Sequence, residues 1–255
     1  MLEIQAIPAF QDNYIWLITQ KNTSTAWVVD PGEASPVLSQ LTQQGLTLSG
    51  ILLTHHHADH IGGVAELVQA FPQAQVFGNE ADAHRLPSLT RALKDGDVFE
   101  LLGCRFTTLE VPGHTLGHLA FFSQDHQPPL LFCGDTLFAG GCGRLFEGSA
   151  EQMAHSLQRL AALPDTTQVY AAHEYTLNNL KFALMAEPDN AALQARYQAC
   201  EALRAAQQAT LPSDLALEKA TNPFLRCHLP SLQKRMDCDQ SVSCFASLRA
   251  WKDRA

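Results

Sequence analysis

Short apolar runs recur along the first two thirds of the chain, and many are rich in β-branched and aromatic residues. Such runs, when turn residues separate them, are typical of β-strands. Two segments, 62–71 and 149–163, instead place apolar residues at helical spacing, and Ser149 and Gln152 form a capping-box pair at the start of the second. The pattern predicts a domain that mixes helices with strands. The predicted strands are 13–19, 25–30, 49–55, 76–79, 97–102, 104–111, 118–123, 129–135 and 167–174.

The pattern changes after Glu174. The remaining segments are rich in alanine and leucine, and prolines interrupt them. We therefore predict two domains, a mixed domain over residues 1–174 and a helical domain over residues 175–255. No internal repeat or low-complexity tract is visible.

Composition limits the classes of protein to consider. Hydrophobic residues make up 46% of the 255 residues, which is enough for a core without disulfides. The seven cysteines have no ligand-like spacing, and we interpret them as mostly buried thiols in a reducing compartment. The N-terminus lacks the basic flank and apolar run of a signal peptide, and no stretch reaches the ~18 apolar residues of a membrane span. We therefore place the protein in the cytoplasm.

The net charge of the chain limits the classes of binding partner to consider. A formal net charge of -9 disfavours nonspecific binding to nucleic acid or to an anionic membrane surface. An anionic small-molecule substrate is compatible with this charge only if arginine or lysine residues gather locally. Nothing in the sequence requires a dimer, and we expect a monomer.

The stretch 54–60, THHHADH, concentrates four histidines and one aspartate within seven residues. It follows a predicted strand and precedes a glycine pair and a predicted helix. Because alternate side chains of extended backbone share a face, His55 and His57 should lie together and His56 should turn away. Asp59 and His60 can approach the same cavity from the start of the helix. The motif thus offers two pairs of metal ligands.

Three further residues of ligand type each follow a predicted strand: His114, Asp135 and His173. Strand ends on one sheet face converge on one rim, so these side chains can join the histidine motif. Together they predict a metal site, and the Asp59 and His60 pair argues for a second ion. We assign the other histidines no ligand role and expect His118 to lie beside the site without binding metal. The others are His56, His84, His126, His155 and His228.

The pattern HxHxDH, followed by a histidine, an aspartate and a histidine at strand ends, resembles the metallo-β-lactamase superfamily. The segment VVDPG at 28–32 is similar to its first motif, in which the aspartate supports the metal loops. Within the superfamily, nearly the entire chain resembles the glyoxalase II branch, the hydroxyacylglutathione hydrolases. The resemblance implies an α/β fold, an αββα four-layer sandwich, with a C-terminal α-helical domain. The matching segments are IPAFQDNYIWLI, THHHADHIGG, PGHTLGH, LFCGDTLFAGGCGRLFEG, AAHEYTLNNLKFA and LRAWKDR.

The resemblance also implies roles for the candidate ligands. His55, His57 and His114 would bind one metal, and Asp59, His60 and His173 would bind another. Asp135 would bridge two divalent ions with a hydroxide between them, so Asp59 and Asp135 are the expected catalytic carboxylates. Zinc is the expected metal, although such ligands also accept iron or manganese.

In glyoxalase II enzymes, positions matching Arg144, Phe146, Tyr175, Arg249 and Lys252 lie at the glutathione moiety of the substrate. Many members have Lys-Phe-Tyr where this chain has Arg144-Leu145-Phe146, so one hydroxyl contact is absent here. Arg144 keeps the charge in a forked geometry suited to a carboxylate. Ala58 replaces a histidine of some relatives at a position that is not a ligand.

The resemblance implies hydrolysis of S-(2-hydroxyacyl)glutathione, with S-D-lactoylglutathione giving D-lactate and glutathione in the second step of methylglyoxal detoxification. Other hydrolases of the same fold, such as a lactonase, a β-lactamase or a nuclease, are alternatives. An iron-dependent glutathione persulfide dioxygenase is another, which the helical residues 175–255 disfavour. A metal-storage or metal-sensing module is the non-enzymatic alternative.

Overall fold

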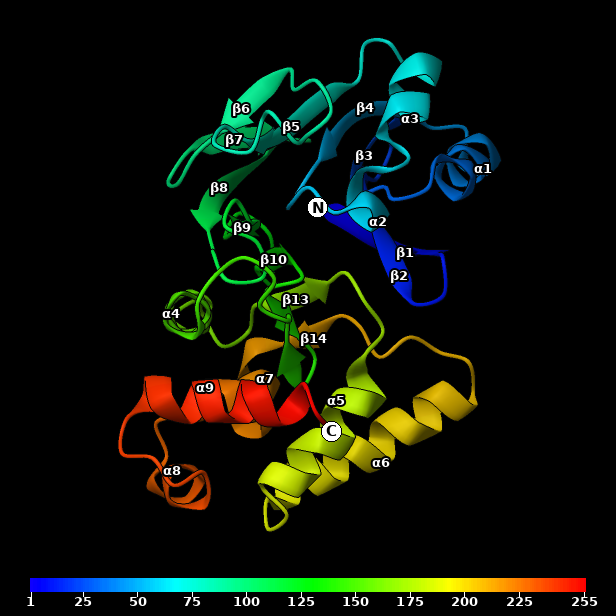
Figure 1. Ribbon diagram of the computed structural model, residues 1–255. Coiled ribbons are helices and arrows are strands. Elements are labelled where there is room, and N and C mark those ends of the chain that lie inside the picture. Colours follow the sequence, from blue (N-terminus) through cyan, green and yellow to red (C-terminus); the bar gives the residue numbers. More distant parts are fainter. The chain divides into compact units, whose positions relative to one another are not determined.

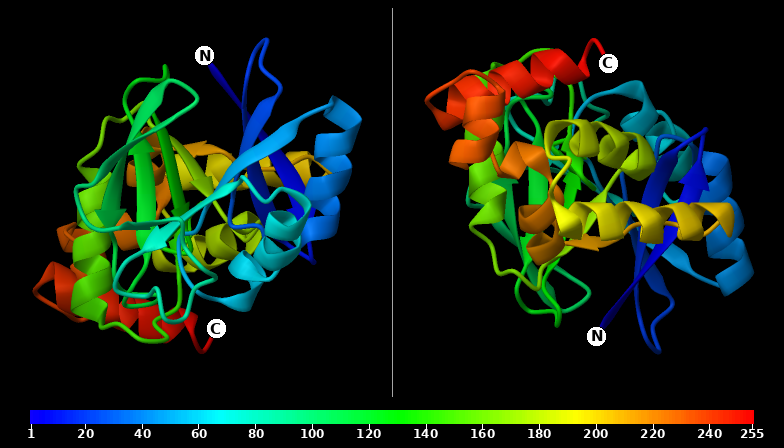
Figure 2. Two further views of the ribbon diagram at one scale, coloured as in Figure 1. Left: turned by 90° about the horizontal axis from the view of Figure 1, so that it is seen from above. Right: turned by 90° about the horizontal axis from the view of Figure 1, so that it is seen from below.

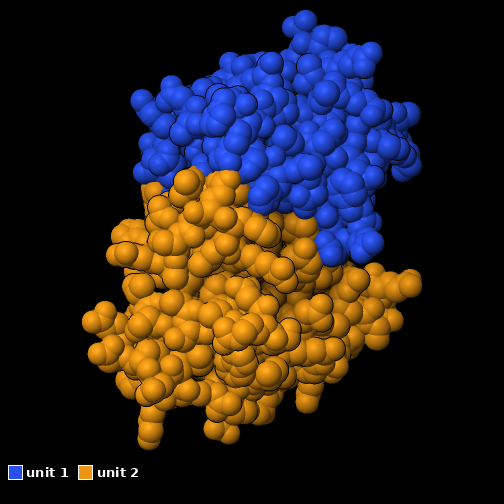
Figure 3. Space-filling model, viewed as in Figure 1, with its two compact units in different colours: residues 1–110, 117–134 blue, residues 111–116, 135–255 orange.

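The computed structural model describes all 255 residues. The chain forms two compact units, which Figure 3 distinguishes by colour. Unit 1 comprises residues 1–110 and 117–134, and unit 2 comprises residues 111–116 and 135–255. The short segment 111–116 therefore leaves unit 1 and returns to it, which makes unit 2 discontinuous in sequence.

The first sheet of unit 1 has six strands in sequence order (Figure 1). β1, β2 and β3 pair antiparallel, and β3 to β6 pair parallel. The parallel steps from β3 to β4 and from β4 to β5 contain helices, as parallel connections usually do. The strands are β1 (Leu2–Ala9), β2 (Asn13–Gln20), β3 (Thr25–Val29), β4 (Thr47–Leu52), β5 (Gln75–Asn79) and β6 (Arg91–Leu93), and the helices are α1 (Ala34–Gln44), α2 (Ala58–Ile61) and α3 (Val64–Ala70).

One hydrophobic core joins this sheet to its helices. Val37 and Leu41 of α1 and Leu67 of α3 are buried in the same cluster as strand residues such as Leu17 and Ile51. The two views of Figure 2 show α1 and α3 beside the first strands. Burial of this apolar face supplies the main stabilisation of the sheet, because the energy scales with the apolar area removed from water.

Unit 1 also contains four antiparallel strands of a second sheet. Phe77 of the first sheet contacts Phe99 of the second, with ring centroids 5.3 Å apart, and Phe99 also contacts Phe106 and Phe121. These aromatic side chains join the facing surfaces of the two sheets. The strands are β7 (Val98–Leu101), β8 (Cys104–Glu110), β9 (Leu119–Ser123) and β10 (Leu130–Gly134).

Unit 2 is mainly helical and has two short antiparallel pairs, β11 with β12 and β13 with β14. α5 and α6 lie side by side (Figures 1 and 2) and bury Leu180, Ala183 and Leu193 between them. The elements are β11 (Leu137–Phe138), β12 (Gly141–Cys142), α4 (Ala150–Ala161), β13 (Gln168–Ala171), α5 (Thr176–Ala186), α6 (Ala191–Ala205), β14 (Ser213–Asp214), α7 (Leu215–Thr221), the 3-10 turn η1 (Pro223–Leu225), α8 (Pro230–Arg235) and α9 (Ser241–Lys252).

The structure confirms most predicted elements and shows where the pattern misled. The capping box at Ser149 is present, with the Ser149 and Gln152 side chains each accepting from the other residue's backbone N–H. The strand predicted at 49–55 ends at Leu52, so the whole histidine motif lies beyond it. The strand β1 and the helix α1 were not predicted. No helix combines the length and the apolar character that crossing a membrane requires.

Candidate metal and substrate site

The histidine motif follows β4 in extended backbone and leads into α2, with His57 as the residue before the helix. His55 and His57 share a face, since Nε2 of His55 lies 3.0 Å from Nδ1 of His57. His56 turns the other way, with Nδ1 3.3 Å from the Asp82 carboxylate and Nε2 3.2 Å from Arg85. The alternation predicted from the sequence is therefore confirmed.

Asp30, the aspartate of VVDPG, is buried and orders two of the motif's histidines. Its carboxylate accepts from the backbone N–H of Thr54 at 2.8 Å, from the Thr54 hydroxyl at 2.6 Å and from Nδ1 of His60 at 3.0 Å. Because the Thr54 hydroxyl donates to Asp30, its oxygen accepts from Nδ1–H of His55, 3.1 Å away. Both rings thus carry a proton on Nδ1 and keep the Nε2 lone pair for another partner. This is the orientation that a metal-binding histidine needs.

The first turn of α2 supplies Asp59 and His60. Nε2 of His60 lies 3.4 Å from Oδ2 of Asp59, and the Asn13 side chain donates to the same oxygen at 3.1 Å. Gly32 permits this packing, because a Cβ there would lie 2.0 Å from the Asp59 carbonyl oxygen. The ring of His118 stacks on that of His55 with centroids 4.7 Å apart, which matches its predicted place beside the site.

His114, Asp135 and His173 come together within unit 2, and all three are buried. Each carboxylate oxygen of Asp135 faces one imidazole, Oδ2 at 3.4 Å from Nε2 of His114 and Oδ1 at 3.4 Å from Nε2 of His173. Nδ1 of His114 donates to the carbonyl of Arg144 at 2.9 Å, so in the neutral form of the ring Nε2 carries the lone pair. A lone pair that faces a carboxylate is repelled unless a proton or a cation lies between them.

These donors fit a divalent cation. Imidazole nitrogen and carboxylate oxygen are ligands for zinc, iron and manganese alike. Asp30, His55 and His60 place three such atoms within 4.8 Å of one another in unit 1. The histidine and aspartate clusters are able to hold a divalent metal, and the donor set alone is compatible with several ions.

All five residues predicted to bind substrate line one cavity of about 480 Å³ in unit 2, together with His114 and Asp135. The sequence did not predict four further lining residues, Phe138, Cys142, Asn178 and Asn179. Asn178 and Asn179 belong to the segment AAHEYTLNNLKFA. The resemblance of this segment to the family was the signal that could have identified them. The residues predicted for substrate are Arg144, Phe146, Tyr175, Arg249 and Lys252.

Two aromatic side chains of the cavity rest on the candidate ligands. The Tyr175 ring stacks on His173 with centroids 4.7 Å apart, and the Phe146 ring meets His114 edge-on at 5.2 Å. Phe146 is 62% exposed, so most of its ring is available to a bound molecule. The cavity therefore presents aromatic surface next to the imidazoles.

The cationic side chains of the cavity differ in their surroundings. Arg249 is buried and donates to the carbonyl of Cys142 at 2.9 Å and to the Asp253 carboxylate at 2.8 Å. Lys252 hydrogen-bonds Asn179 and lies 5.9 Å from the centre of the Phe182 ring. Burial lowers the pKa of Lys252 to about 8, so its charge changes within an accessible pH range. A protonated Lys252 beside Arg249 favours an anionic ligand.

The thiol in the cavity wall is not activated as a nucleophile. Cys142 lines the cavity, but burial raises the pKa of its thiol, which keeps it protonated at neutral pH. Cys133 is buried, and all seven cysteines are free. Cys142 is therefore not expected to attack a bound substrate.

Residues 10–173 match the metallo-beta-lactamase superfamily, and residues 174–255 match the C-terminus of hydroxyacylglutathione hydrolase. A hydroxyacylglutathione hydrolase of Aliivibrio salmonicida is 54% identical, with 99% of each chain covered, and one of Pseudomonas aeruginosa is 51% identical over the whole of both chains. The chain belongs to the hydroxyacylglutathione hydrolase family. The predicted family and the predicted class of metal-dependent hydrolase are thereby confirmed.

Solved structures agree on the fold of the chain. ETHE1 from Myxococcus xanthus matches with a TM-score of 0.65 and 24% identity, covering 99% of this chain and 98% of that one. TTHA1623, solved in a di-iron-bound form, matches with a TM-score of 0.62 and 28% identity, covering 88% of this chain and all of that one. The predicted metallo-β-lactamase fold with a C-terminal helical region is confirmed.

Proposed function

We propose that the chain hydrolyses the thioester of S-(2-hydroxyacyl)glutathione, with S-D-lactoylglutathione as substrate and D-lactate and glutathione as products. The observation that carries this proposal is a single cavity lined by Asp135 and His114 and by the cations Arg144, Arg249 and Lys252. Metal ligands beside a cationic cluster suit a thioester whose thiol half carries two carboxylates. The reaction is the second step of methylglyoxal detoxification.

We propose two divalent ions, one held by His55, His57 and His114 and one by Asp59, His60 and His173, with Asp135 bridging them. Zinc is the proposed metal, and the di-iron form of TTHA1623 makes iron the first alternative. Support comes from the hydrogen bonds that leave Nε2 of His55, His60 and His114 as lone-pair donors. When bound, such ions polarise a carbonyl and lower the pKa of a water molecule.

The chain's own residues then bind and orient the substrate. Arg144 has the forked geometry that pairs with a carboxylate, and Lys252 contributes a point charge. Tyr175, stacked on His173, and the exposed Phe146 ring flank the thioester and exclude water. The leaving thiolate needs no proton donor, because its thiol has a pKa of about 8.5.

We propose that residues 1–174 form the catalytic domain and that residues 175–255 form the glutathione-binding domain. We also propose that the enzyme acts as a monomer in the cytoplasm. The free state of all seven cysteines supports a reducing compartment. A sedimentation measurement at micromolar concentration tests the monomer.

The proposed reaction is tested by following glutathione release from S-D-lactoylglutathione while the bound metals are counted. We expect release by the parent with about two metal ions per chain, and loss of release in Asp135→Ala. Asp125→Ala is the matched control, because Asp125 pairs only with the exposed Arg105. A metal-loaded parent without release contradicts the proposal, and oxygen consumption with glutathione persulfide would instead identify a dioxygenase.

A further inference from the structure

The hairpin of β11 and β12 lies between Asp135 and Arg144 in the sequence and contributes Phe138 and Cys142 to the cavity wall. Side chains from α5, from α9 and from Asn222, the residue after α7, donate hydrogen bonds to its backbone carbonyls. Asn222 donates to the carbonyl oxygens of Phe138 at 3.2 Å and Gly141 at 2.9 Å. In a hairpin with two-residue strands, such contacts replace the ladder of hydrogen bonds that would fix a longer one.

Two further backbone carbonyls of this segment also accept hydrogen bonds from helix side chains. Asn179 of α5 donates to the carbonyl of Ala139 at 3.0 Å, and Arg249 of α9 donates to the carbonyl of Cys142 at 2.9 Å. α5, α7 and α9 and the residues that follow them therefore determine the backbone path of this part of the cavity wall.

Glu218 of α7 accepts hydrogen bonds both from the hairpin and from Asn222. Its side chain is fully buried, and Oε2 accepts from the backbone N–H of Gly140 at 2.9 Å and from the side-chain amide of Asn222 at 3.1 Å. Gly140 has a φ of +67°, and a Cβ there would lie 2.6 Å from Leu180. One carboxylate oxygen thus holds the turn directly and also orients Asn222, which holds both strands.

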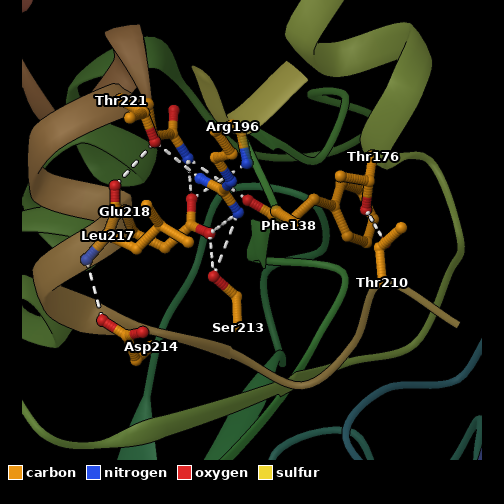
Figure 4. Close-up of polar contacts among 12 residues, drawn as sticks. Phe138, Thr176, Arg196, Thr210, Ser213, Asp214, Leu217, Glu218 and Thr221 are labelled. Atoms are coloured by element: carbon orange, nitrogen blue, oxygen red, sulfur yellow. Dashed lines mark hydrogen bonds and ion pairs between the residues drawn. The ribbon is translucent and has the colours of Figure 1, made fainter. Parts of the chain in front are cut away.

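The other oxygen of Glu218 is bound to a buried arginine (Figure 4). Oε1 accepts from the Arg196 guanidinium and from the Ser213 hydroxyl. Arg196 also donates to Ser213 at 3.0 Å and to Thr221 at 2.6 Å. Both oxygens of Glu218 thus act as hydrogen-bond acceptors, and an acceptor is what the N–H of Gly140 requires.

We propose that Glu218 is a positioning residue for the substrate. It does not line the cavity. It acts through the hairpin, holding Phe138 and Cys142 in the wall and fixing the start of the segment that carries Arg144. This inference rests on the proposed function, since it assigns the hairpin to binding of the glutathione moiety.

Two double variants separate positioning from general stability. Arg196→Met/Glu218→Gln removes the ion pair but keeps an amide oxygen that can accept from Gly140. Arg196→Met/Glu218→Met removes the acceptor as well, without leaving a buried unpaired charge. Lys219→Met is the control on the same helix, because Lys219 pairs with Asp165 at the surface.

We expect the Met/Met variant to raise KM for S-D-lactoylglutathione about tenfold, with kcat changed less, and to weaken glutathione binding in calorimetry by a similar factor. The Met/Gln variant should keep a KM within about threefold of the parent. If Met/Met does not fold, Asn222→Ser replaces it, because that change removes the donor to Phe138 and Gly141 and leaves the ion pair.

Equal KM values and equal glutathione affinities in folded Met/Met and Met/Gln variants would overturn the positioning role. A parent that binds glutathione without hydrolysing the thioester would contradict the proposed reaction, and the glutathione affinities of the variants would still decide the role of Glu218. A parent that neither binds nor hydrolyses would overturn both.

Discussion

A single carboxylate, that of Asp30, sets the proton positions of two candidate ligands. It accepts from His60 directly and from His55 through Thr54. In Asp30→Asn the amide presents a donor where a second acceptor is needed, so one ring must move its proton to Nε2. We expect metal content and kcat/KM to fall about 10–100-fold. Metal analysis and steady-state kinetics on the same sample test this.

Asp125→Asn serves as the control for Asp30→Asn, because it changes an exposed carboxylate in the same unit. If Asp30→Asn kept full metal content and full activity, the orientation of the histidines would not depend on Asp30. A loss of metal that excess zinc restores, with recovery of kcat, would show that the variant is folded and that only affinity has changed.

Lys252 predicts a pH dependence of substrate binding. Burial lowers its pKa to about 8, so the free enzyme loses this positive charge as pH rises through that value. We expect kcat/KM for the anionic thioester to fall above pH about 8, because kcat/KM reports ionisations of the free enzyme. Lys252→Arg stays protonated and should flatten this limb of the profile. The same fall in Lys252→Arg would assign it to another group.

At the scale of elements, the start of α4 tests how far local sequence determines a helix end. Ser149→Ala removes the side-chain acceptor for the backbone N–H of Gln152. We expect a loss of about 1 kcal/mol in the free energy of unfolding. Ser149→Asp should retain the cap and the stability, and both variants should keep the parent kcat. Denaturant unfolding monitored by circular dichroism measures the difference.

The prediction of elements succeeded where one periodic pattern dominates a segment. The buried runs of β2 and β3 and the apolar face of α4 are of this kind. α1 was missed because serine, threonine and glutamine fill its surface and only three of its residues are buried. The end of α1 at Gly45, which has a φ of +64°, could not be predicted without first predicting the helix.

The site could be predicted from sequence to the extent that its residues are close in sequence or belong to a family motif. The pairing of His55 with His57 follows from local alternation and was predicted. The contact from Asp30 to Thr54 spans 24 residues, and the supporting role of Asp30 was expected only through the family motif VVDPG. The contact from Glu218 to Gly140 spans 78 residues and belongs to no motif that the sequence analysis singled out. Nothing local distinguishes Glu218 from an exposed helix carboxylate, so its buried role becomes visible only in the folded chain.

At the scale of the whole molecule, an acidic protein binds an anion by concentrating its few cations. The chain has a formal net charge of -9, yet Arg144, Arg249 and Lys252 line the same cavity. At physiological salt, charges beyond ~8 Å are largely screened, so local cations outweigh distant carboxylates. The net charge therefore disfavours polyanions that need a broad basic surface, while a small anion can still bind.

Metal removal tests the stability of the whole molecule. The candidate ligands are buried polar groups, and a bound cation offsets the cost of their desolvation. His55, His60, His114, Asp135 and His173 are each less than 9% exposed. A ligand at 1,000 times its Kd stabilises the folded state by about 4 kcal/mol, so chelation should lower Tm by about 10 °C and abolish activity. Calorimetry with and without chelator measures this, and added zinc should reverse it. Asp135→Ala should respond less to chelator, and an unchanged Tm in a parent that has lost its metals would contradict the proposed metal-binding role of these residues.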